Sequence, residues 1–567
     1  MEQIGQFRYT KFATTLPDLV DGRDSKRHRI VICGGGPVGM VTALGLARHG
    51  IASTIVEADD SVCVGSRAAC VSRRSLEIIE QLGVLKPFLD KALPWTGGRS
   101  YYRTKEVFQF EMPHDANQKL PPMVNLQQYY IEQFLLDEIG KYAGLIEVRW
   151  ASRVSKLDRR ADGCTITVVN VLGEYQMEAD WLIATDGGQS FVRNALDLKL
   201  KGIAYEGKYV IADIEMQSDA PAERRAWFDP PSNPGSTMLM HRQPDNVWRI
   251  DYQVPDNVDP EEAIREENVL PIVEKHLAML GERQPWKPVW LSIYRAGAMT
   301  LDSYWHGRVL FAGNAAHVVP IFGVRGLNSG IDDAYNLAWK LAFVVKGLAP
   351  QELLATYSEE RVQAFHENIS YATKSTEFMA PPSRGYQLMR EAALSLAEKH
   401  PVLCSLLNPR QTSPIVYQDS HLNTPADPRE DFAGGPAPGA VLLECPIRLA
   451  SAPDAPAYLT DLLSEGFTIL DFSTDGSMHA GVAAALEQLG SDGIPVQVCI
   501  ATRTPDARTD VRATHCALDH TGNLFDLYDG EPGTVYLVRP DGHIAGRWRN
   551  VGAEALQTAV YRALAKI

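Results

Sequence analysis

The sequence predicts an α/β protein of several domains, and three observations support this prediction. A short apolar run at 29–33 leads into a glycine-rich turn and a helical pattern. Stretches that alternate between apolar and polar residues, typical of antiparallel strands, interrupt the chain at 95–122 and 203–295. The length of 567 residues also exceeds what one hydrophobic core usually supports, so two or three domains are expected.

The first element is a βαβ unit near the N-terminus. Its parts are, in order, the strand 29–33, the glycines Gly34, Gly36 and Gly39, the helix 40–49, the strand 51–56 and the acid Glu57. The glycines allow a tight turn, the helix N-terminus attracts a pyrophosphate, and the acid can accept hydrogen bonds from ribose hydroxyls. This unit predicts dinucleotide binding, and the alternative is an ordinary tight turn in an α/β core.

Two later segments predict further parts of one site. An apolar strand at 179–186 ends at Asp186, and a short helix follows it. At 313–341 a strand end leads through a Gly/Pro-rich loop to a helix that is predicted to begin near Leu327. Gly326 lets a ligand approach the backbone, and the free amides of Leu327 and Asn328 suit a ring edge that accepts negative charge.

These segments together resemble the FAD-dependent aromatic hydroxylases, the class A flavoprotein monooxygenases of the para-hydroxybenzoate hydroxylase and phenol hydroxylase type. That family carries the glycine fingerprint, a D-G-x-x-S-x-V-R segment and a G-D-A-A-H-x-x-P-P-x-x-G-x-G-x-N segment in this order, and this chain has them at 34–39, 186–193 and 313–328. The resemblance spans about 29–361. It implies a Rossmann-type, glutathione-reductase-like FAD-binding domain with an inserted antiparallel-sheet substrate domain.

The resemblance also implies which residues bind FAD. They are Gly34, Gly36, Gly39, Glu57, Arg67, Gln128, Asp186, Asn314, Pro320, Arg325, Gly326, Leu327 and Asn328. The glycines would hold the pyrophosphate, Glu57 the adenosine ribose, and Pro320 would lie against the isoalloxazine ring. The amides of Leu327 and Asn328 would stabilise the anion of the reduced flavin.

Two of these positions depart from the family pattern or differ among its members. Asn314 replaces the usual aspartate, so a charge-assisted hydrogen bond to the flavin becomes a neutral one and weaker FAD retention is a hypothesis. Arg325 is either a fixed cation beside the flavin, which would favour its reduced anion, or a surface arginine on a loop.

The substrate domain is expected to form from 95–122 and 203–295. Strands at 236–242 and 247–254, joined by a turn at 243–246, would belong to a sheet that roofs the pocket. His241 and Tyr252 are the candidates for proton transfer, and Arg249 is similar in position to an arginine that binds the substrate carboxylate in some relatives. For each of the three, a structural role is the alternative.

The remaining segments complete the predicted domain organisation. Residues 1–28 are an N-terminal extension, and 29–94, 123–202 and 296–375 form the FAD-binding domain. A helical segment and linker at 376–440 leads to 441–567, which resembles the thioredoxin-like domain of phenol hydroxylase relatives. That domain lacks CxxC, so it cannot do dithiol chemistry, and a structural role at a homodimer interface is expected.

The resemblance implies a reaction in two halves. NADH or NADPH, between which the sequence does not decide, reduces FAD, and a flavin C4a-hydroperoxide formed with O2 then hydroxylates a phenolic or otherwise activated aromatic ring. The alternatives are another flavin-dependent oxidoreductase, a halogenase of the same fold, or a flavin-binding protein without hydroxylase activity. A halogenase would carry a W-x-W-x-I-P segment, which this sequence does not contain.

Composition narrows the partners further. A formal net charge of −15 argues against nucleic acid or an anionic membrane surface, and no run of about 18 apolar residues is present to span a bilayer. The N-terminus lacks the apolar core of a signal peptide. The eight cysteines show neither CxxC nor metal-type spacing, so we expect reduced thiols, no metal and a cytoplasmic protein.

Overall fold

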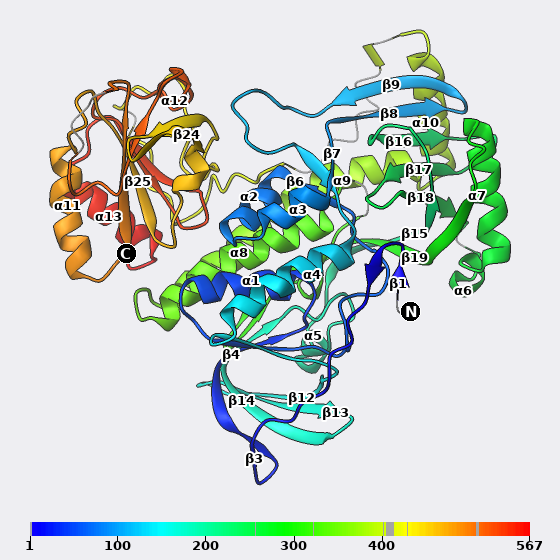
Figure 1. Cartoon of the computed structure of the whole chain (residues 1–567), viewed down its shortest axis with the longest axis horizontal. Coiled ribbons are helices and arrows are strands. Elements are labelled where there is room, and N and C mark those ends of the chain that lie inside the picture. The colour runs from blue at the N-terminus through cyan, green and yellow to red at the C-terminus, as the bar shows by residue number, and fades with distance from the viewer. Residues whose placement is uncertain are drawn as a thin grey trace.

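The computed structural model describes residues 3–255, 257–320, 323–400, 402–403, 413–427, 429–505 and 510–567. Its three largest sheets have nine, eight and seven strands. In Figure 1 the nine-stranded sheet lies at the lower centre beneath long helices, the eight-stranded sheet at the upper right, and the seven-stranded sheet at the left. The mixture of sheets and helices confirms the predicted α/β class.

The nine-stranded sheet carries the N-terminal βαβ unit. Its strands are β3 (Leu19–Val20), β4 (Arg23–Cys33), β5 (Ser53–Val56), β11 (Ile146–Arg149), β12 (Arg153–Arg159), β13 (Cys164–Asn170), β14 (Gly173–Ala184), β20 (Trp305–His306) and β21 (Val309–Phe311). Strands β11, β5, β4, β14 and β21 run parallel, whereas β12 and β13 pair antiparallel beside them. β4 begins earlier than predicted, because its polar first half pairs with β3 and β14 at a partly exposed end of the sheet.

Helices cover the faces of this sheet. They are α1 (Pro37–Arg48), α2 (Arg73–Gln81), α3 (Leu85–Lys91), α4 (Gln128–Ile139), α5 (Phe191–Ala195), α8 (Gly326–Val345) and α9 (Leu353–Met379), with the short turns η1 (Gly140–Tyr142) and η2 (Gly313–Ala315). α1 lies against α8 so closely that a Cβ at Gly45 would come within 2.7 Å of the Ala338 side chain. The core therefore forms around α1, α8 and the buried strand residues Ile30, Val31 and Ile32.

The eight-stranded sheet has the order β22-β19-β15-β18-β17-β16-β8-β9. These strands are β8 (Gly97–Tyr102), β9 (Lys105–Glu111), β15 (Lys201–Met216), β16 (Arg224–Phe228), β17 (Thr237–Arg242), β18 (Val247–Val254), β19 (Trp286–Thr300) and β22 (His317–Val318). The hairpin predicted at 236–254 is present as β17 and β18. The sheet is antiparallel, as predicted, except that β8, from a distant part of the chain, pairs parallel with β16.

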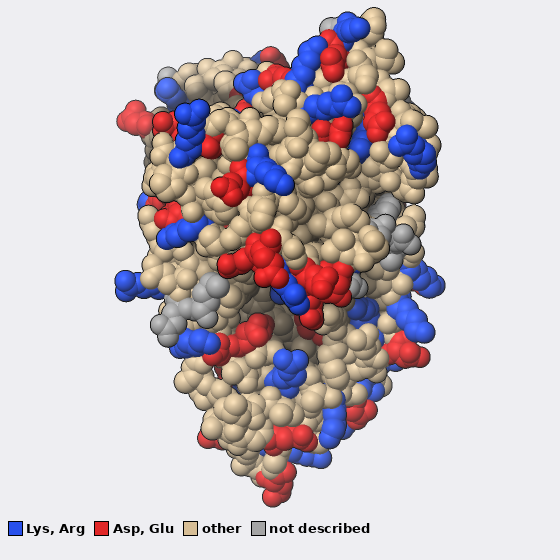
Figure 2. Space-filling model, turned by 90° about the vertical axis from the view of Figure 1, so that its right-hand side faces the viewer, with Lys and Arg blue, Asp and Glu red and all other residues tan. Residues whose placement is uncertain are grey.

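Smaller elements surround the eight-stranded sheet. They are α6 (Pro260–Ala263), α7 (Glu266–Leu280) and α10 (Arg384–Ala397), with the short strands β1 (Gln3–Ile4), β2 (Phe7–Arg8), β6 (Cys70–Ser72), β7 (Leu93–Trp95) and β10 (Met123–Asn125). The apolar side of α7 packs on the face that carries Trp248, Ile250 and Tyr252. Figure 2 shows charges of both signs interspersed on its face of the molecule, with acidic side chains gathered around a hollow near the middle.

The seven-stranded sheet belongs to the C-terminal part of the chain. Its elements are β23 (Pro446–Leu449), β24 (Ala452–Tyr458), η4 (Leu459–Leu462), β25 (Phe467–Phe472), α11 (Ala480–Ser491), β26 (Val496–Thr502), β27 (His515–Leu518), α12 (Asn523–Leu527), β28 (Val535–Val538), β29 (Ile544–Trp548) and α13 (Ala553–Ala563). Strands β25, β26 and β27 are parallel, and β28 and β29 continue the sheet antiparallel. The thioredoxin-like character of this part stays a prediction.

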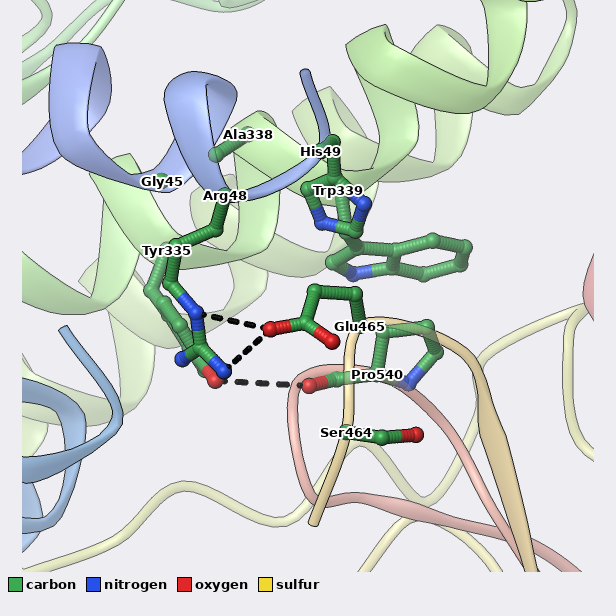
Figure 3. A pocket seen from close by; sticks show the side chains of 9 residues that line it. All are labelled: Gly45, Arg48, His49, Tyr335, Ala338, Trp339, Ser464, Glu465 and Pro540. Atoms are coloured by element: carbon green, nitrogen blue, oxygen red, sulfur yellow. Dashed lines mark hydrogen bonds and ion pairs between the residues drawn. The ribbon is translucent and has the colours of Figure 1, made fainter. Parts of the chain in front are cut away.

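A buried charge cluster joins the C-terminal part to α8 and α9. Glu360 of α9 accepts hydrogen bonds from Lys340 of α8 at 2.7 Å and from Arg539 of the β28–β29 turn at 2.7 Å. Arg539 also pairs with Asp541, and none of these side chains is more than 2% exposed. Beside this cluster, Arg48 of α1 pairs with Glu465 across a hollow that Figure 3 shows between α1, α8 and the C-terminal loops.

Candidate flavin and substrate site

The glycine turn between β4 and α1 is shaped partly by packing and partly by open space. Gly34 has φ +106°, and a Cβ there would lie 2.6 Å from the Thr185 carbonyl oxygen. A Cβ at Gly39 would lie 2.1 Å from the Gly34 oxygen. Gly36 caps the N-terminus of α1, and a Cβ there would meet no described atom within 4 Å apart from its chain neighbours and the backbone of its own helix. Gly34 and Gly39 therefore close the turn, whereas Gly36 leaves room at the positive end of the helix for an anion.

Glu57 follows β5 and is tied to this turn. Its carboxylate accepts hydrogen bonds from the Gly35 N–H at 2.5 Å and the Asp59 N–H at 2.8 Å. The side chain is half-buried, and burial raises its pKa. Glu57 therefore lies beside the turn, as the sequence predicts, with lone pairs that two backbone donors do not exhaust.

Gln128, the first residue of α4, holds the loop that carries Arg67. Its side-chain oxygen accepts from the Ala68 N–H at 3.1 Å, and its own N–H donates to Ser66 Oγ at 3.1 Å. The side-chain Nε2 of Gln128 donates to the carboxylate of Glu132, and burial raises the pKa of Glu132 to about 7. The structure thus brings Gln128 and the loop together, while the Arg67 side chain projects to the exposed surface.

Asp186 at the end of β14 has one carboxylate oxygen in use and one free. Oδ2 accepts from the Val192 N–H at 3.0 Å, at the start of α5. Oδ1 is buried and has no hydrogen-bond partner within the described chain. Burial raises the pKa of this carboxyl group. A buried acceptor without a partner is costly, so a hydroxyl-bearing ligand at this position fits the structure.

The N-terminus of α8 presents backbone donors that the helix itself does not pair. The helix begins at Gly326, one residue before the predicted start, and its first-turn amides at Leu327 and Asn328 have no acceptor within the helix. The nearest atom to a Cβ at Gly326 would be Val319 Cγ2 at 3.6 Å. This distance is an ordinary van der Waals contact, and the approach of a ligand to this backbone stays a prediction.

The side chain of Asn328 has a different task from its amide. Oδ1 accepts from the Ser72 N–H at 2.9 Å and from Ser75 Oγ at 2.7 Å. Nδ2 donates to the carbonyl oxygens of Cys70 at 3.2 Å and Val324 at 2.6 Å. Asn328 therefore fixes the first turn of α8 to β6 and α2, a role that its place in the motif did not reveal.

The other residues of this loop are placed as follows. Pro320 is buried, whereas Asn314 in η2 is exposed. Arg325 is 3% exposed and donates to Asn368 of α9 at 3.0 Å, and burial lowers its pKa to about 10. The alternative interpretation of Arg325 as a surface arginine was wrong, because α9 covers the loop.

Sequence reasoning missed a buried network behind this loop. Asp333 of α8 accepts from the Gly313 N–H at 2.9 Å, contacts His317 Nε2 at 2.7 Å and pairs with Arg361 Nε at 2.6 Å. Burial opposes ionisation of Asp333, but the charge of Arg361 and the contact with His317 lower its pKa to about 2. Asp333 lies in the segment 313–341 and Arg361 at the end of the region that resembles the family. The sequence does not reveal that these two side chains form an ion pair, because they are far apart along the chain.

The three catalytic candidates do not share one face of the eight-stranded sheet. His241 of β17 lies directly opposite Arg249 of β18, whereas Tyr252 lies opposite Met238. Side chains alternate across a strand, so Tyr252 projects to the opposite face, into the apolar cluster beside α7. The structure brings His241 and Arg249 together and separates Tyr252 from them.

Arg249 is engaged on all sides. Its Nε and Nη2 donate to the two oxygens of Asp213 in β15, each at 2.9 Å. Nη1 donates to the Arg67 carbonyl at 3.0 Å, and Nη2 also contacts the Ser66 carbonyl. The face of the sheet that carries Arg249 therefore faces the loop held by Gln128.

Two further ionisable residues lie on this same face, and neither was singled out from the sequence. Asp251 follows Arg249 by two residues on β18 and is 4% exposed. Arg224 of β16 is also 4% exposed. The signal that could have found Asp251 is the Val-Trp-Arg-Ile-Asp-Tyr-Gln-Val alternation, in which charged residues recur at every second position of a strand that is otherwise apolar or aromatic.

The residues present fit an FAD molecule. The open space at Gly36, the Oδ1 of Asp186 and the first-turn amides of α8, which have no acceptor within the helix, are the kinds of group that a pyrophosphate, a ribityl chain and an electron-accepting ring require. Among the described residues, no cluster of three or more His, Cys, Asp or Glu side chains could hold a metal ion. None of the described helices combines the length and apolarity needed to cross a bilayer.

The site is that of a flavoprotein. Its parts are the glycine turn before α1, the carboxylate of Asp186 and the N-terminus of α8. The FAD binding domain family model matches residues 27–372, more than half of the chain, and the protein belongs to this family. It binds FAD through that domain.

Two similar proteins of known activity align with nearly the whole chain. The 3-(3-hydroxy-phenyl)propionate/3-hydroxycinnamic acid hydroxylase of Mycolicibacterium smegmatis is 25% identical over 546 residues, 94% of this chain and 92% of that protein. The 6-methylpretetramide 4-monooxygenase of Streptomyces rimosus is 27% identical over 564 residues, 97% of this chain and 95% of that protein.

Solved structures share the fold. The flavin-dependent monooxygenase PieE, in complex with FAD and substrate, aligns with a TM-score of 0.79 at 21% identity and covers 96% of this chain and 100% of its own. Aklavinone-11 hydroxylase, with FAD and aklavinone, aligns with a TM-score of 0.72 at 22% identity over 95% of this chain and 100% of its own.

Proposed function

We propose that this protein is an NAD(P)H- and O2-dependent FAD monooxygenase that hydroxylates a phenolic or otherwise activated aromatic compound. The observation that carries the proposal is the polar inner face of the eight-stranded sheet, which faces the loop at 66–67 through Arg249. A flavin site covered by a sheet whose buried face carries ionisable groups suits chemistry on a polar ring shielded from water. The names of the whole-length relatives support the same reaction class.

Each part of the site has a task. Gly36 and the N-terminus of α1 would bind the pyrophosphate, and Oδ1 of Asp186 would accept a hydrogen bond from a ribityl hydroxyl. The amides of Leu327 and Asn328 would hold negative charge at the edge of the ring. When bound, FAD supplies hydride acceptance and the activation of O2. The sheet and the first turn of α8 exclude water and orient the aromatic ring.

We extend the proposal to the organisation of the chain. Residues 29–94, 123–202 and 296–375 would form the FAD-binding domain, and 95–122 with 203–295 the substrate domain. The chain would begin with an extension at 1–28, and a helical segment and linker at 376–440 would lead to a thioredoxin-like domain at 441–567. This last domain would have a structural role in a cytoplasmic homodimer. The buried charges around Glu360 support the structural role of this C-terminal part.

The proposal is tested by spectroscopy and rapid mixing. Purified protein loaded with FAD is mixed anaerobically with NADH or NADPH, alone and with each member of a panel of phenols and aromatic acids. We expect a bound-flavin spectrum, reduction that one class of aromatic accelerates, and a hydroxylated product when O2 is admitted. Bound FAD whose reduction no aromatic accelerates, with no hydroxylated product, would contradict the proposal and favour another flavin-dependent reaction.

A further inference from the structure

We propose that Asp251 accepts the proton of a ring hydroxyl of the substrate, and that Arg224 is the cation that stabilises the resulting phenolate. This inference rests on the proposed function and adds to it the identity of the proton acceptor and the group of the substrate that it recognises. The substrate class is a hydroxyarene that presents its hydroxyl, rather than a carboxylate, to the sheet.

The register of the strands places these groups on one face. Asp251 lies two residues after Arg249 on β18, so both side chains project from the same side of the sheet. Arg249 donates to the carbonyls of the loop at 66–67, which identifies that side as the one facing the flavin-domain loop. Arg225 pairs with Met240, so Arg224 comes opposite His241 on the same face.

Three buried polar atoms on this face have no hydrogen-bond partner within the described chain. They are Oδ1 of Asp251, Nη1 of Arg224 and Nδ1 of His241, in residues that are 4%, 4% and 7% exposed. Native proteins leave few such atoms unpaired, and each is costly. Because the strand register places all three residues on the face that Arg249 joins to the flavin-domain loop, we infer a polar ligand that completes their hydrogen bonds.

The charges on this face favour a hydroxyl as that ligand. Asp251 and Arg224 are close enough for each to shift the pKa of the other, yet no ion pair within 4.0 Å joins them in the described structure. A hydroxyl can donate to Asp251 and, once ionised, accept from Arg224. A carboxylate ligand at this place would instead be repelled by ionised Asp251.

Base strength distinguishes Asp251 from its neighbour His241. Burial raises the pKa of Asp251 to about 7, against the opposing charges of Arg249 and Arg224. Burial, with the charges of the same two arginines, lowers the pKa of His241 to about 3. Asp251 is therefore the stronger base of the two, and its pKa lies near neutral pH, as general base catalysis requires. The ionisable groups around Asp251 are Arg249 on the same strand, Asp213 of β15, Arg224 of β16, His241 of β17 and Cys70 of β6.

The proton transfer balances without another reactant. The O–H bond of the substrate breaks, its electron pair stays on the ring oxygen, and a new O–H bond forms at Oδ1 of Asp251. No atom is oxidised or reduced in this step. Arg224, on the same face of the sheet, would compensate the new negative charge of the ring oxygen, and this charge activates the ring toward an electrophilic oxygen.

The test uses Asp251→Asn, which keeps the size of the side chain but removes the base. FAD-loaded parent and variant are compared in hydroxylation of a series of para-substituted phenols whose own pKa values run from about 7 to 10. At pH 7 we expect the variant to be slower by about a hundredfold for the least acidic phenols and nearly equal for the most acidic ones. Its rate should recover as the pH rises toward the pKa of each phenol.

Conservative and control variants separate this role from folding. Asp251→Glu should restore part of the rate for weakly acidic phenols, and Asp158→Asn on exposed β12 makes the same change where no ligand is expected. A uniform loss for all phenols, or no loss for any, in Asp251→Asn would overturn the proposal. If no phenol is hydroxylated by the parent despite bound FAD, the proposed function itself fails, and that outcome is distinct.

Arg224→Gln tests the second half of the proposal. We expect the pKa of a bound chromophoric phenol such as 4-nitrophenol, read from its phenolate absorbance, to rise in the variant relative to the parent. If instead the bound pKa stays unchanged and KM rises only for phenols that carry a carboxylate, Arg224 is a carboxylate anchor and the proposal is overturned.

Discussion

Asp213 binds the guanidinium of Arg249 through both of its oxygens, each at 2.9 Å, in a buried bidentate pair between β15 and β18. The pair turns the remaining donors of Arg249 toward the carbonyls of Ser66 and Arg67. One ion pair within the sheet thus fixes the sheet to the loop of the flavin-binding part. A carboxylate substrate would have to compete with Asp213 for this arginine.

Removing one partner of that pair should destabilise the protein strongly. Asp213→Asn leaves Arg249 buried without its counter-charge, and the free energy of unfolding should fall by about 3 kcal/mol or more. Urea unfolding of the FAD-loaded protein measures the change. The exposed replacement Asp158→Asn should stay within about 0.5 kcal/mol of the parent. If both substitutions lower the free energy of unfolding by the same amount, the buried pair contributes no more to stability than an exposed carboxylate does.

The glycines of the turn should separate folding from cofactor binding. Gly36→Ala places a methyl group in open space, so the apoprotein should fold with almost unchanged stability but bind FAD at least tenfold more weakly. Gly39→Ala drives a methyl group into the Gly34 carbonyl, so the apoprotein itself should lose stability. Flavin fluorescence titration measures the FAD affinity of both variants, and thermal unfolding of the apoproteins measures their stability. If Gly36→Ala binds FAD as tightly as the parent does, the prediction is wrong.

Asn314→Asp should strengthen FAD binding. Asn314 is exposed in η2, so a carboxylate there suffers little burial cost in the apoprotein. If residue 314 accepts a hydroxyl of the flavin side chain, a charged acceptor makes a hydrogen bond about twice as strong as a neutral one. We expect a several-fold lower dissociation constant for FAD in a titration of the apoprotein. Equal affinities of parent and variant would remove residue 314 from the cofactor site.

Asp333 should give the protein an acid-sensitive component of stability. Its folded-state pKa of about 2 lies below the ordinary value of 3.8, so its contribution is present above pH 3.8 and disappears as the pH falls through 2. The difference in unfolding free energy between the parent and Asp333→Asn should therefore shrink by about 2 kcal/mol between pH 4 and pH 2. Denaturant unfolding at a series of pH values measures this difference. A constant difference would mean that the ionisation of Asp333 does not stabilise the fold.

Local sequence patterns predicted the parts of the site that depend on short-range geometry. The glycine turn requires particular backbone angles, and a helix start follows from its own first residues, so both could be located along the chain. The start of α8 was predicted within one residue, and the β17–β18 hairpin was found from its alternation. FAD as the cofactor is confirmed by the family to which residues 27–372 belong.

Features that depend on contacts between distant segments could not be predicted from local sequence patterns. The parallel pairing of β8 with β16 and the burial of Arg325 under α9 both require knowing which segments meet. Tyr252 is instructive because alternation along β18 already separated it from Arg249, so the two should not have been assigned to one site. The same alternation would have added Asp251, had every second residue of the strand been considered.

The contact of Glu360 with Lys340 and Arg539 has an evolutionary consequence. A chain that lost its C-terminal part would retain Glu360 and Lys340 inside a surface shaped to exclude water, with one partner gone. Such a truncation would need several compensating substitutions in α8 and α9 before it became viable. Loss or exchange of the C-terminal part alone should therefore destabilise the flavin-binding part, because it leaves buried charges of α8 and α9 without one of their partners.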